Sequence, residues 1–171
     1  MQKWGIGLHG SSAELASSVD PDNKMQLAGG GLHVRYRINH RWGLEVSMDK
    51  IKGEYMTGVD RDSRPLTLTG MLHLTRSTKW DGYLLAGFGG SRDLVTSTDP
   101  SGREIEIEYR QTHIHLGGGL EYRWSNFGIS AEVRLIGAAR NEDFAQGAPL
   151  DGPVPEESSG GMFSMGATYY F

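Results

Sequence analysis

Apolar and polar positions alternate along eight segments of this chain. The clearest segment is residues 42–49, in which one parity is apolar and the other is glycine or polar: Trp42, Leu44, Val46 and Met48 against Gly43, Glu45, Ser47 and Asp49. Because successive side chains of a strand point to opposite faces, such a segment has one apolar face and one polar face. The alternation predicts strands at about residues 3–10, 25–38, 42–52, 65–75, 82–92, 105–123, 127–138 and 161–171. No segment keeps a helical period, so we predict no long helix.

The links between these segments alternate in length. Those at 39–41, 76–81 and 124–126 are short, whereas those at 11–24, 53–64, 93–103 and 141–160 are long and polar. In an antiparallel up-and-down arrangement, all short links and both termini fall at one end. Eight two-faced strands in a single domain, residues 1–171, therefore predict an all-β fold, an eight-stranded antiparallel up-and-down barrel.

Alternation alone does not decide which face of the barrel is outside. A soluble barrel of the lipocalin kind turns its apolar face inward around a ligand, whereas a transmembrane barrel turns it toward lipid. The position of the aromatic residues favours the transmembrane barrel, because membrane barrels carry aromatic girdles at the headgroup level. At the short-link end we predict such a girdle, made of Trp4, Trp42, Trp80, Trp124, Phe127, Tyr169 and Phe171.

Glycine content and link length favour the same orientation. The polar face carries many glycines, among them Gly5, Gly7, Gly117 and Gly119. Small residues are needed where large charged side chains share the narrow interior of an eight-stranded barrel. Short links at one end and long links at the other match the periplasmic turns and extracellular loops of membrane barrels. We therefore predict a transmembrane β-barrel.

Composition narrows the chemistry. The chain has 171 residues, 25 glycines, no cysteine and a net charge of −4. Without cysteine it has no disulfide, thiolate metal site or cysteine nucleophile. With no basic cluster along the sequence, it lacks the footprint of a nucleic-acid-binding protein. No apolar run approaches the roughly 18 residues of a membrane helix, and the mean hydropathy of −0.43 suits strands that are apolar on one face only.

The pattern resembles the small eight-stranded outer-membrane barrels of the OmpA, OmpX and OmpW kind over essentially the whole chain. In that family a terminal phenylalanine, preceded by aromatic residues at alternate positions, is the signal for the barrel-assembly machinery. Phe171, Tyr169 and the weaker match Ala167 fit this signal. The resemblance implies a location in the bacterial outer membrane, with membrane lipid and lipopolysaccharide as partners. The chain begins directly with a predicted strand, so we expect a signal peptide to have been removed.

The polar face carries charges of both signs, which we expect inside the barrel. These candidates for ion pairs in the lumen are Arg35, Arg37, Glu45, Asp49, Glu121, Glu132 and Arg134. The short link at 39–41 places Arg35 opposite Glu45. Buried charges must be matched, because removing one partner leaves the other uncompensated. We favour ion pairs that fill the lumen over a gated pore whose pairs exchange, since eight strands leave room for little more than side chains.

Polar groups that suggest metal binding or catalysis have simpler explanations. Five of the six histidines share the lumen parity: His9, His33, His73, His113 and His115. The last two have the spacing of metal ligands on one strand face, but the five lie at different heights, so we expect no metal site and no cofactor. Ser130, Glu132 and His115 have the composition of a hydrolytic triad. Groups of three polar residues on facing strands usually have a packing role and no catalytic role, so we predict that the protein is not an enzyme.

The long links are polar, and the segment 105–123 changes parity part of the way along. The links carry scattered acids without the spacing of a calcium-binding loop, and residues 141–160, with three prolines, are our candidate for contact with a protein partner. The beginning of the segment 105–123 has the opposite parity to its remainder: Ile105, Ile107 and Tyr109 against Ile114 and Leu116. This predicts either a bulge near Arg110 and Gln111 or a first half that stands clear of the membrane.

The sequence therefore predicts a non-enzymatic outer-membrane barrel with a structural role or a role in surface contacts. A narrow channel or carrier for small or apolar solutes is the alternative. An outer-membrane lipid hydrolase or acyltransferase is a third hypothesis, because a fold hosts many functions and only the site distinguishes them.

Overall fold

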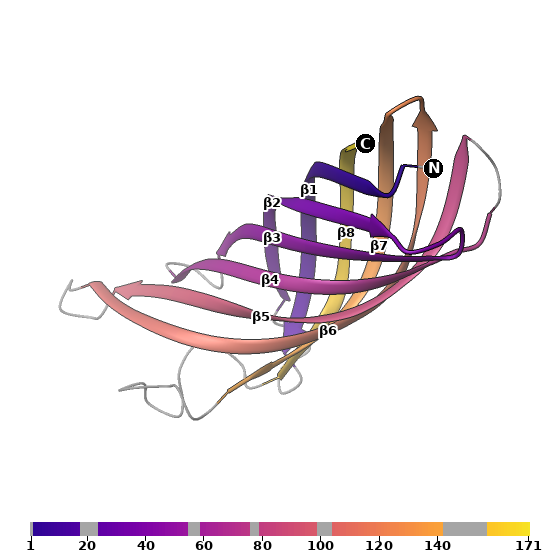
Figure 1. Cartoon of the computed structure of the whole chain (residues 1–171). Coiled ribbons are helices and arrows are strands. Elements are labelled where there is room, and N and C mark those ends of the chain that lie inside the picture. Colours follow the sequence, from indigo (N-terminus) through magenta and orange to yellow (C-terminus); the bar gives the residue numbers. More distant parts are fainter. Residues whose placement is uncertain (1, 18–23, 55–58, 76–78, 99–103, 142–156) are drawn as a thin grey trace.

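The computed structural model describes residues 2–17, 24–54, 59–75, 79–98, 104–141 and 157–171. These residues form eight strands: β1 (Trp4–Ser17), β2 (Lys24–Arg37), β3 (Trp42–Glu54), β4 (Val59–His73), β5 (Trp80–Thr98), β6 (Glu104–Trp124), β7 (Phe127–Arg140) and β8 (Glu157–Tyr170). Each strand is antiparallel to its neighbours, and β8 pairs with β1, so the sheet closes into a barrel in chain order (Figure 1). The predicted eight-stranded antiparallel barrel is confirmed. The described residues include no helix that is long and apolar enough to cross a membrane.

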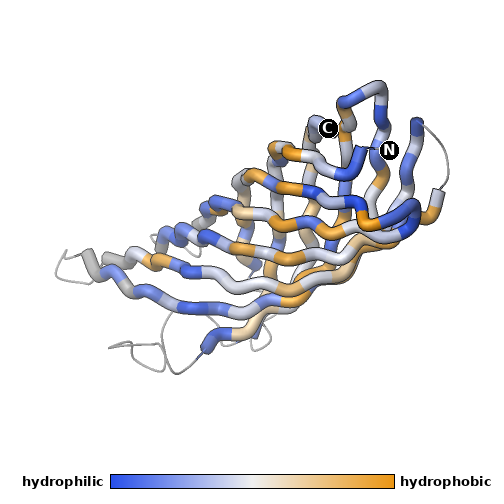
Figure 2. Tube along the Cα trace, viewed as in Figure 1, coloured by the Kyte–Doolittle hydropathy of each residue, from blue (hydrophilic) through white to orange (hydrophobic). Residues whose placement is uncertain are grey.

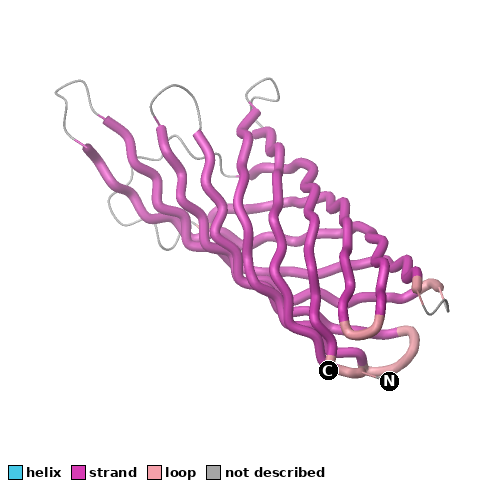
Figure 3. The backbone as a smooth tube through the Cα atoms, turned by 90° about the horizontal axis from the view of Figure 1, so that it is seen from above, coloured by secondary structure: helices cyan, strands magenta, loops and turns pink. Residues whose placement is uncertain are grey.

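Both termini lie at the same end of the barrel as the turns that join β2 to β3 and β6 to β7 (Figure 3). We call this the short-link end and the opposite one the far end. Between β2 and β3 the side-chain oxygen of Asn39 accepts hydrogen bonds from the backbone N–H groups of Arg41 (2.8 Å) and Trp42 (2.9 Å), which turns the chain. Between β6 and β7, Ser125 has a φ of 52°, the left-handed conformation that tight hairpin turns favour.

The strands are longer at the far end than the sequence predicts. β1 continues to Ser17 and β8 begins at Glu157, whereas the alternation predicts an end at 10 and a start at 161. The loop predicted over 11–24 is therefore wrong for 11–17 and 24, because the alternation does not stop there but inverts. Ala13 and Leu15 are buried inside the barrel, and Glu14 between them is exposed. Because apolar residues are expected on the outer face, the sequence pattern predicts a loop here.

The same inversion explains the phase change in β6. Its register with β5 runs without interruption from Trp80 opposite Tyr122 to Thr98 opposite Glu104. Of the two predicted alternatives, the uninterrupted register excludes a bulge near Arg110 and Gln111, and a first half of the strand beyond the membrane stays a prediction. Tyr109 is buried in the lumen at the far end, only 1 % exposed, and burial raises the pKa of its phenol. The side chains of Ile105 and Ile107 lie outside those that the structure describes.

The two faces of the wall differ as predicted. Apolar side chains of the outer face are more than half exposed, among them Leu8, Leu32, Met48, Ile114 and Leu135. The inward-facing charged residues Arg35, Glu45 and Glu132 are each less than one-tenth exposed. Figure 2 shows this alternation along the middle of the strands and the more hydrophilic ends beyond it. The apolar face is outside and the charged face is inside.

Candidate functional site: charges across the barrel lumen

Arg35 of β2 lies at the centre of the lumen and binds three carboxylates. Its Nε donates to Glu45 of β3 (2.6 Å), its Nη1 to Glu121 of β6 (2.9 Å) and its Nη2 to Glu132 of β7 (2.7 Å). Arg35 lies opposite Glu45 in the register of neighbouring strands, but the other two glutamates come from the far wall. One planar guanidinium, whose donors form a fork, therefore ties three separate strands together.

Two more arginines complete the arrangement. Arg134 of β7 donates to Glu45 (3.1 Å) and to Glu132 (2.5 Å), and Arg123 of β6 donates to Glu121 (2.5 Å). Three arginines thus face three glutamates. We call this set the ion-pair layer: Arg35, Glu45, Glu121, Arg123, Glu132 and Arg134.

Two tyrosines bind two of these carboxylates, each at the oxygen that also accepts a hydrogen bond from Arg35. The hydroxyl of Tyr83 donates to Glu132 (2.6 Å), and the hydroxyl of Tyr170 donates to Glu121 (2.6 Å). Room for Tyr83 comes from Gly119 on the neighbouring strand, where an added Cβ would lie 2.6 Å from the tyrosine ring. Each of the three glutamates accepts hydrogen bonds on both of its oxygens. No carboxylate oxygen of the layer is left without a donor.

The charge balance of the layer has an energetic reason. A charge taken out of water is costly unless an opposite charge and enough hydrogen bonds compensate it. All three glutamates are 2–4 % exposed, and Arg35 and Arg134 are 6 % and 8 % exposed. Matched charges make this burial tolerable, and removing one member leaves its partners buried and uncompensated.

The remaining predicted lumen charges lie in two separate clusters. Toward the short-link end, Arg37 and His73 both contact Asp81, and the His73–Asp81 distance is 2.9 Å. Toward the far end, Asp49 contacts His9, whose other ring nitrogen lies 3.2 Å from His33. Of the seven candidates from the sequence, the structure brings together Arg35, Glu45, Glu121, Glu132 and Arg134. It does not bring Arg37 or Asp49 into the same layer.

Sequence reasoning missed Arg123, Tyr83 and Tyr170 as members of this site. All three have the parity of the lumen face, which is the signal that was available. The parity of Tyr83 is hard to recognise because the residues around it are apolar. The parity of Tyr170 is hard to recognise because its neighbours at the C-terminus are aromatic. Which carboxylate each one reaches depends on contacts across the barrel, and neighbouring-strand register does not give these.

The histidines of the lumen are engaged with threonines as well as carboxylates. His113 pairs with Thr67 (3.0 Å) and His115 with Thr69 (3.1 Å). Within the described part of the chain, no group of three or more histidine, aspartate or glutamate residues is arranged to hold a metal ion. His115 thus binds a threonine rather than Glu132, which contacts Arg35, Arg134 and Tyr83. This geometry gives no support to the Ser130, Glu132 and His115 triad.

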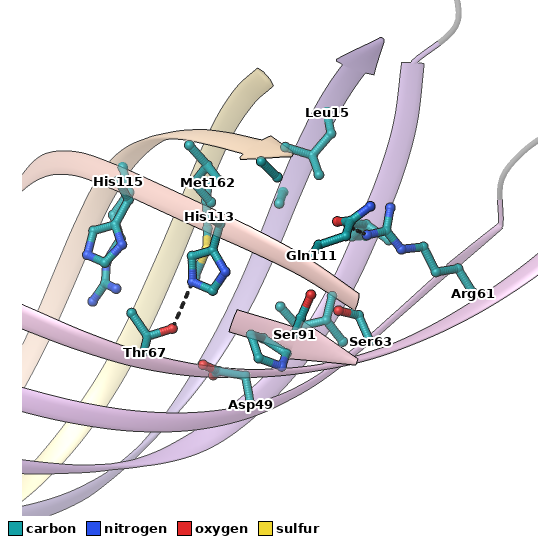
Figure 4. A pocket seen from close by; sticks show the side chains of 17 residues that line it. Leu15, Asp49, Arg61, Ser63, Thr67, Ser91, Gln111, His113, His115 and Met162 are labelled. Carbon is teal, nitrogen blue, oxygen red and sulfur yellow. Dashed lines mark hydrogen bonds between the residues drawn. The ribbon is translucent and has the colours of Figure 1, made fainter. Parts of the chain in front are cut away.

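Above the ion-pair layer the lumen widens into a partly apolar chamber (Figure 4). Its volume is about 80 Å³, room for a few waters or methylene groups. Apolar side chains from β1, β2, β3, β7 and β8 line one side: Ala13, Leu15, Leu27, Ile51, Ile136 and Met162. On the polar side, Arg61 donates to Asp93 (2.9 Å) and Gln111 (2.8 Å).

Two smaller cavities follow along the lumen toward the short-link end. One of about 10 Å³ lies among the layer residues, and one of about 20 Å³ lies below them. Arg134 lines both the chamber and the first small cavity, and Arg35 lines both small cavities. The two guanidinium groups therefore stand between neighbouring cavities.

Aromatic rings surround the outside of the short-link end. Trp4 packs against Tyr36 with ring centroids 4.6 Å apart, and Trp80 packs against Tyr122 at 4.8 Å. A row of four rings continues across β6, β7 and β8: Trp124, Phe127, Tyr169 and Phe171. The four tryptophans, Phe127, Tyr169 and Phe171 are between 43 % and 61 % exposed on the outer wall, where amphipathic rings meet the interface between lipid and water.

A closed barrel with an apolar outer wall, an aromatic girdle and a charged interior is the architecture of a transmembrane β-barrel. Residues 2–171 match the family described as outer membrane protein beta-barrel domain. The chain belongs to this family, and its location is the outer membrane.

Solved structures show the same fold. Neisserial surface protein A has 17 % sequence identity and a TM-score of 0.70, with 98 % of this chain and 97 % of that chain covered. Ail, the attachment invasion locus protein of Yersinia pestis, has 20 % identity, a TM-score of 0.60 and full coverage of both chains. The N-terminal barrel domain of Pseudomonas aeruginosa OprF has 15 % identity, a TM-score of 0.56 and full coverage. No curated protein sequence matches this chain.

Proposed function

We propose that this protein is a non-enzymatic outer-membrane barrel with a closed lumen, which holds long extracellular loops at the cell surface for contact with other molecules. The observation that carries the proposal is the ion-pair layer. Arg35 joins carboxylates from β3, β6 and β7, so the layer fills the lumen at its middle.

The coupling within the layer argues against a conducting path. To let a solute pass, Arg35 or Arg134 must leave its glutamates, and each such movement strands buried charge at a cost of several kcal/mol. Because Glu45 and Glu132 each bind both arginines, one arginine cannot leave without disturbing the other. This supports a closed barrel over a gated pore.

The names of two proteins of similar fold support a role in surface contacts. One is a surface protein of Neisseria, and the other is an attachment protein, Ail, which has also been solved with the heparin analogue sucrose octasulfate. For the present chain, the described strands continue beyond the apolar band at the far end. We therefore extend the surface role, and contact with a protein or sulfated ligand, to this chain as a proposal. Residues 142–156, the core of the candidate contact loop, lie outside the described residues.

Two measurements test the proposal. Proteoliposomes that contain the full chain should retain a small sugar as well as protein-free liposomes do, and rapid efflux would contradict a closed lumen. Cells that display the protein should bind a surface coated with sulfated polysaccharide. Residues 142–156 carry four carboxylates and no lysine or arginine, so replacing them by a glycine-serine linker should not weaken binding to this anionic surface. The same replacement should weaken binding to a protein-coated surface, and a scrambled loop of the same composition controls for charge. Equal binding by cells without the protein would contradict the surface role.

The C-terminal strand is the proposed signal for the barrel-assembly machinery. Tyr169 and Phe171 point outward from the barrel, 43 % and 61 % exposed, and are therefore accessible along the wall. Deleting Phe171 should lower the amount of folded protein in the outer membrane, measured by heat-modifiable mobility of membrane fractions. An unchanged amount of folded protein would contradict the role of Phe171 in the assembly signal.

The chamber at the far end favours a second candidate function, a carrier for small apolar solutes. The observation that supports this function is the apolar lining by Ala13, Leu15 and Leu27 inside an otherwise polar lumen. Xenon, which is small enough for a chamber of this volume, should then bind the folded barrel as followed by xenon NMR, and Ala13→Phe should fill the chamber and abolish binding. Equal binding by the variant would exclude the chamber as a site.

A further inference from the structure

Five cations gather on one side of the outer wall, just beyond the apolar band. They are Lys50 and Lys52 of β3, Arg64 of β4, Arg92 of β5 and Arg110 of β6. All five have the outward parity of their strands, and all but the half-buried Arg110 are exposed. We call these residues the cationic belt. They are spread along the sequence, so no basic cluster is visible there, but four consecutive strands bring them together.

Strand register places the arginines of the belt side by side. Arg64 lies directly opposite Arg92, and Arg92 lies directly opposite Arg110. Residues in such positions have Cβ atoms about 5 Å apart, and like charges there are destabilising. Lys50, Lys52 and Arg64 share one carboxylate, Asp62, at 3.6, 3.9 and 3.7 Å. Asp62 is a single partly exposed carboxylate shared by three cations, and the next outward residue on β6 is the exposed Glu108. The row of Arg64, Arg92 and Arg110 itself contains no carboxylate, so positive charge is concentrated in that row.

The other half of the barrel has no such feature. On β3 to β6, the two outward positions that follow Met48, Leu66, Phe88 and Ile114 toward the far end hold the five cations, Asp62 and two neutral residues. The outward positions after these hold Asp60, Leu94 and Glu108. On β7, β8, β1 and β2, the equivalent positions are all small and neutral: Gly137, Ala139, Gly161, Ser159, Gly10, Ser12, Gly30 and Ala28. The positive charge therefore belongs to one face of the molecule and is not a general property of its rim.

The distance between the belt and the apolar rows of the outer wall indicates which kind of molecule the belt binds. The row next to Arg64, Arg92 and Arg110 toward the short-link end is Leu66, Gly90 and Thr112, and the following row is Leu68, Phe88 and Ile114. At about 3.3 Å per residue, the arginines stand roughly 7 Å beyond the first row and 13 Å beyond the second. Phe88 and Ile114 are 60 % and 66 % exposed on the lipid-facing wall. A molecule that fits both surfaces has an anionic head and acyl chains.

We propose that the cationic belt on β3–β6 is a binding site for phosphorylated lipid headgroups of the outer leaflet, with the acyl chains lying on the apolar rows around Leu68, Phe88 and Ile114. Arginine suits this ligand because its planar fork binds phosphate oxygens in pairs. Phosphate groups between the three arginines offset the repulsion that their register imposes. The assignment is independent of whether the lumen conducts.

Binding of lipid A to the full chain in neutral detergent tests the proposal. The probes are diphosphorylated, monophosphorylated and dephosphorylated lipid A, and affinity is measured by native mass spectrometry. The triple variant Arg64→Gln, Arg92→Gln, Arg110→Gln should bind diphosphorylated lipid A about tenfold or more weakly. The matched control Lys3→Gln, Arg41→Gln, Lys79→Gln removes the same charge at the short-link end and should bind as the wild type does. Equal affinity of the belt variant and the wild type would overturn the proposal.

Two further arms distinguish the source of the phosphate and exclude a folding defect. Excess inorganic diphosphate should compete poorly, because it has no acyl chains. Full competition by it, or tighter binding of heparin than of lipid A, would overturn the lipid assignment. In neutral detergent without lipid A, the belt variant should unfold at the same or a higher temperature than the wild type, since like-charge repulsion is removed. Added diphosphorylated lipid A should raise the unfolding temperature of the wild type more than that of the variant, and an equal rise would contradict the site.

Discussion

Arg35 and Glu132 are bonded across the lumen, from β2 and β7, with 2.7 Å between Nη2 and Oε1. The two residues are far apart in sequence and their strands are not neighbours in the barrel. Their contact therefore ties opposite walls together, and this distinguishes it from a cross-strand pair. We therefore expect the stability of the barrel, and the proposed closure of its lumen, to depend on this contact.

Arg35→Met should destabilise the barrel strongly. The substitution keeps an apolar stem but leaves three buried glutamates with one cation fewer, so we expect the free energy of unfolding to fall by about 3–5 kcal/mol. Urea-induced unfolding in detergent micelles measures this. Arg41→Met, at an exposed position of a short turn, is the control and should change stability little. A loss below about 1 kcal/mol for Arg35→Met would show that the glutamates find other compensation.

Coupling within the layer can be measured by a double-mutant cycle. Glu45→Gln alone leaves Arg35 and Arg134 with less negative charge, but in the background of Arg35→Met it removes a carboxylate that has lost a partner. We therefore expect the double variant to be more stable than the sum of the single effects implies, by about 1–3 kcal/mol. Strict additivity would mean that the two residues do not interact in solution.

Tyr83→Phe should cost less than loss of an arginine but more than a surface change. It removes only the hydroxyl that donates to Glu132 at 2.6 Å, and hydrogen bonds to charged groups contribute about 1.5–3 kcal/mol. Unfolding in urea again provides the measurement. Tyr122→Phe, whose ring packs against Trp80 on the outer wall, is the matched control. If both variants lose the same stability, the buried hydrogen bond has no special value.

Gly119→Ala tests the fit of the Tyr83 ring. An added Cβ would lie 2.6 Å from that ring, whereas a Cβ at Gly161 would meet nothing within 4 Å. Overpacking of this kind costs about 1–3 kcal/mol, so Gly119→Ala should unfold at a lower temperature and Gly161→Ala should not. Thermal unfolding followed by heat-modifiable gel mobility compares the two. Similar unfolding temperatures would mean that the tyrosine ring has room to move.

Leu15→Gln tests the inverted pattern at the far end. Leu15 is 6 % exposed inside the barrel and packs near Met25 and Leu27, while its neighbour Glu14 is exposed. Burial of a leucine side chain contributes about 2–3 kcal/mol, so Leu15→Gln should destabilise the far end, and Glu14→Gln should not. Hydrogen exchange of β1 amides reports this locally. Unchanged exchange in Leu15→Gln would place residues 11–17 in a loop, as the sequence alone predicts.

The strands and their orientation could be predicted because they depend on local information. Alternation decides which side chains share a face, and the short turn after Arg37 decides that Arg35 lies opposite Glu45. The contacts of Arg35 with Glu121 and Glu132 could not be predicted in this way. They depend on the stagger of all eight strands, which brings residues of equal height together across the lumen.

The far end was misjudged for a different reason. A reading that expects apolar residues outside takes Ala13, Leu15 and Tyr109 as breaks in the pattern, although the strands continue above the bilayer with their apolar side inward. The sequence pattern does not reveal the cationic belt because its successive members lie between two and twenty-eight positions apart in the chain. Only the register of β4, β5 and β6 aligns Arg64, Arg92 and Arg110 in one row.

The closed lumen is tested most directly by current recordings of the purified full chain in planar lipid bilayers. The wild type should insert without discrete conductance steps at neutral pH, because the ion-pair layer fills the barrel. The smaller variant Arg35→Ala with Arg134→Ala, provided that it still folds by heat-modifiable mobility, should show small steps. Regular steps from the wild type that the paired variant leaves unchanged would contradict a lumen closed by these residues.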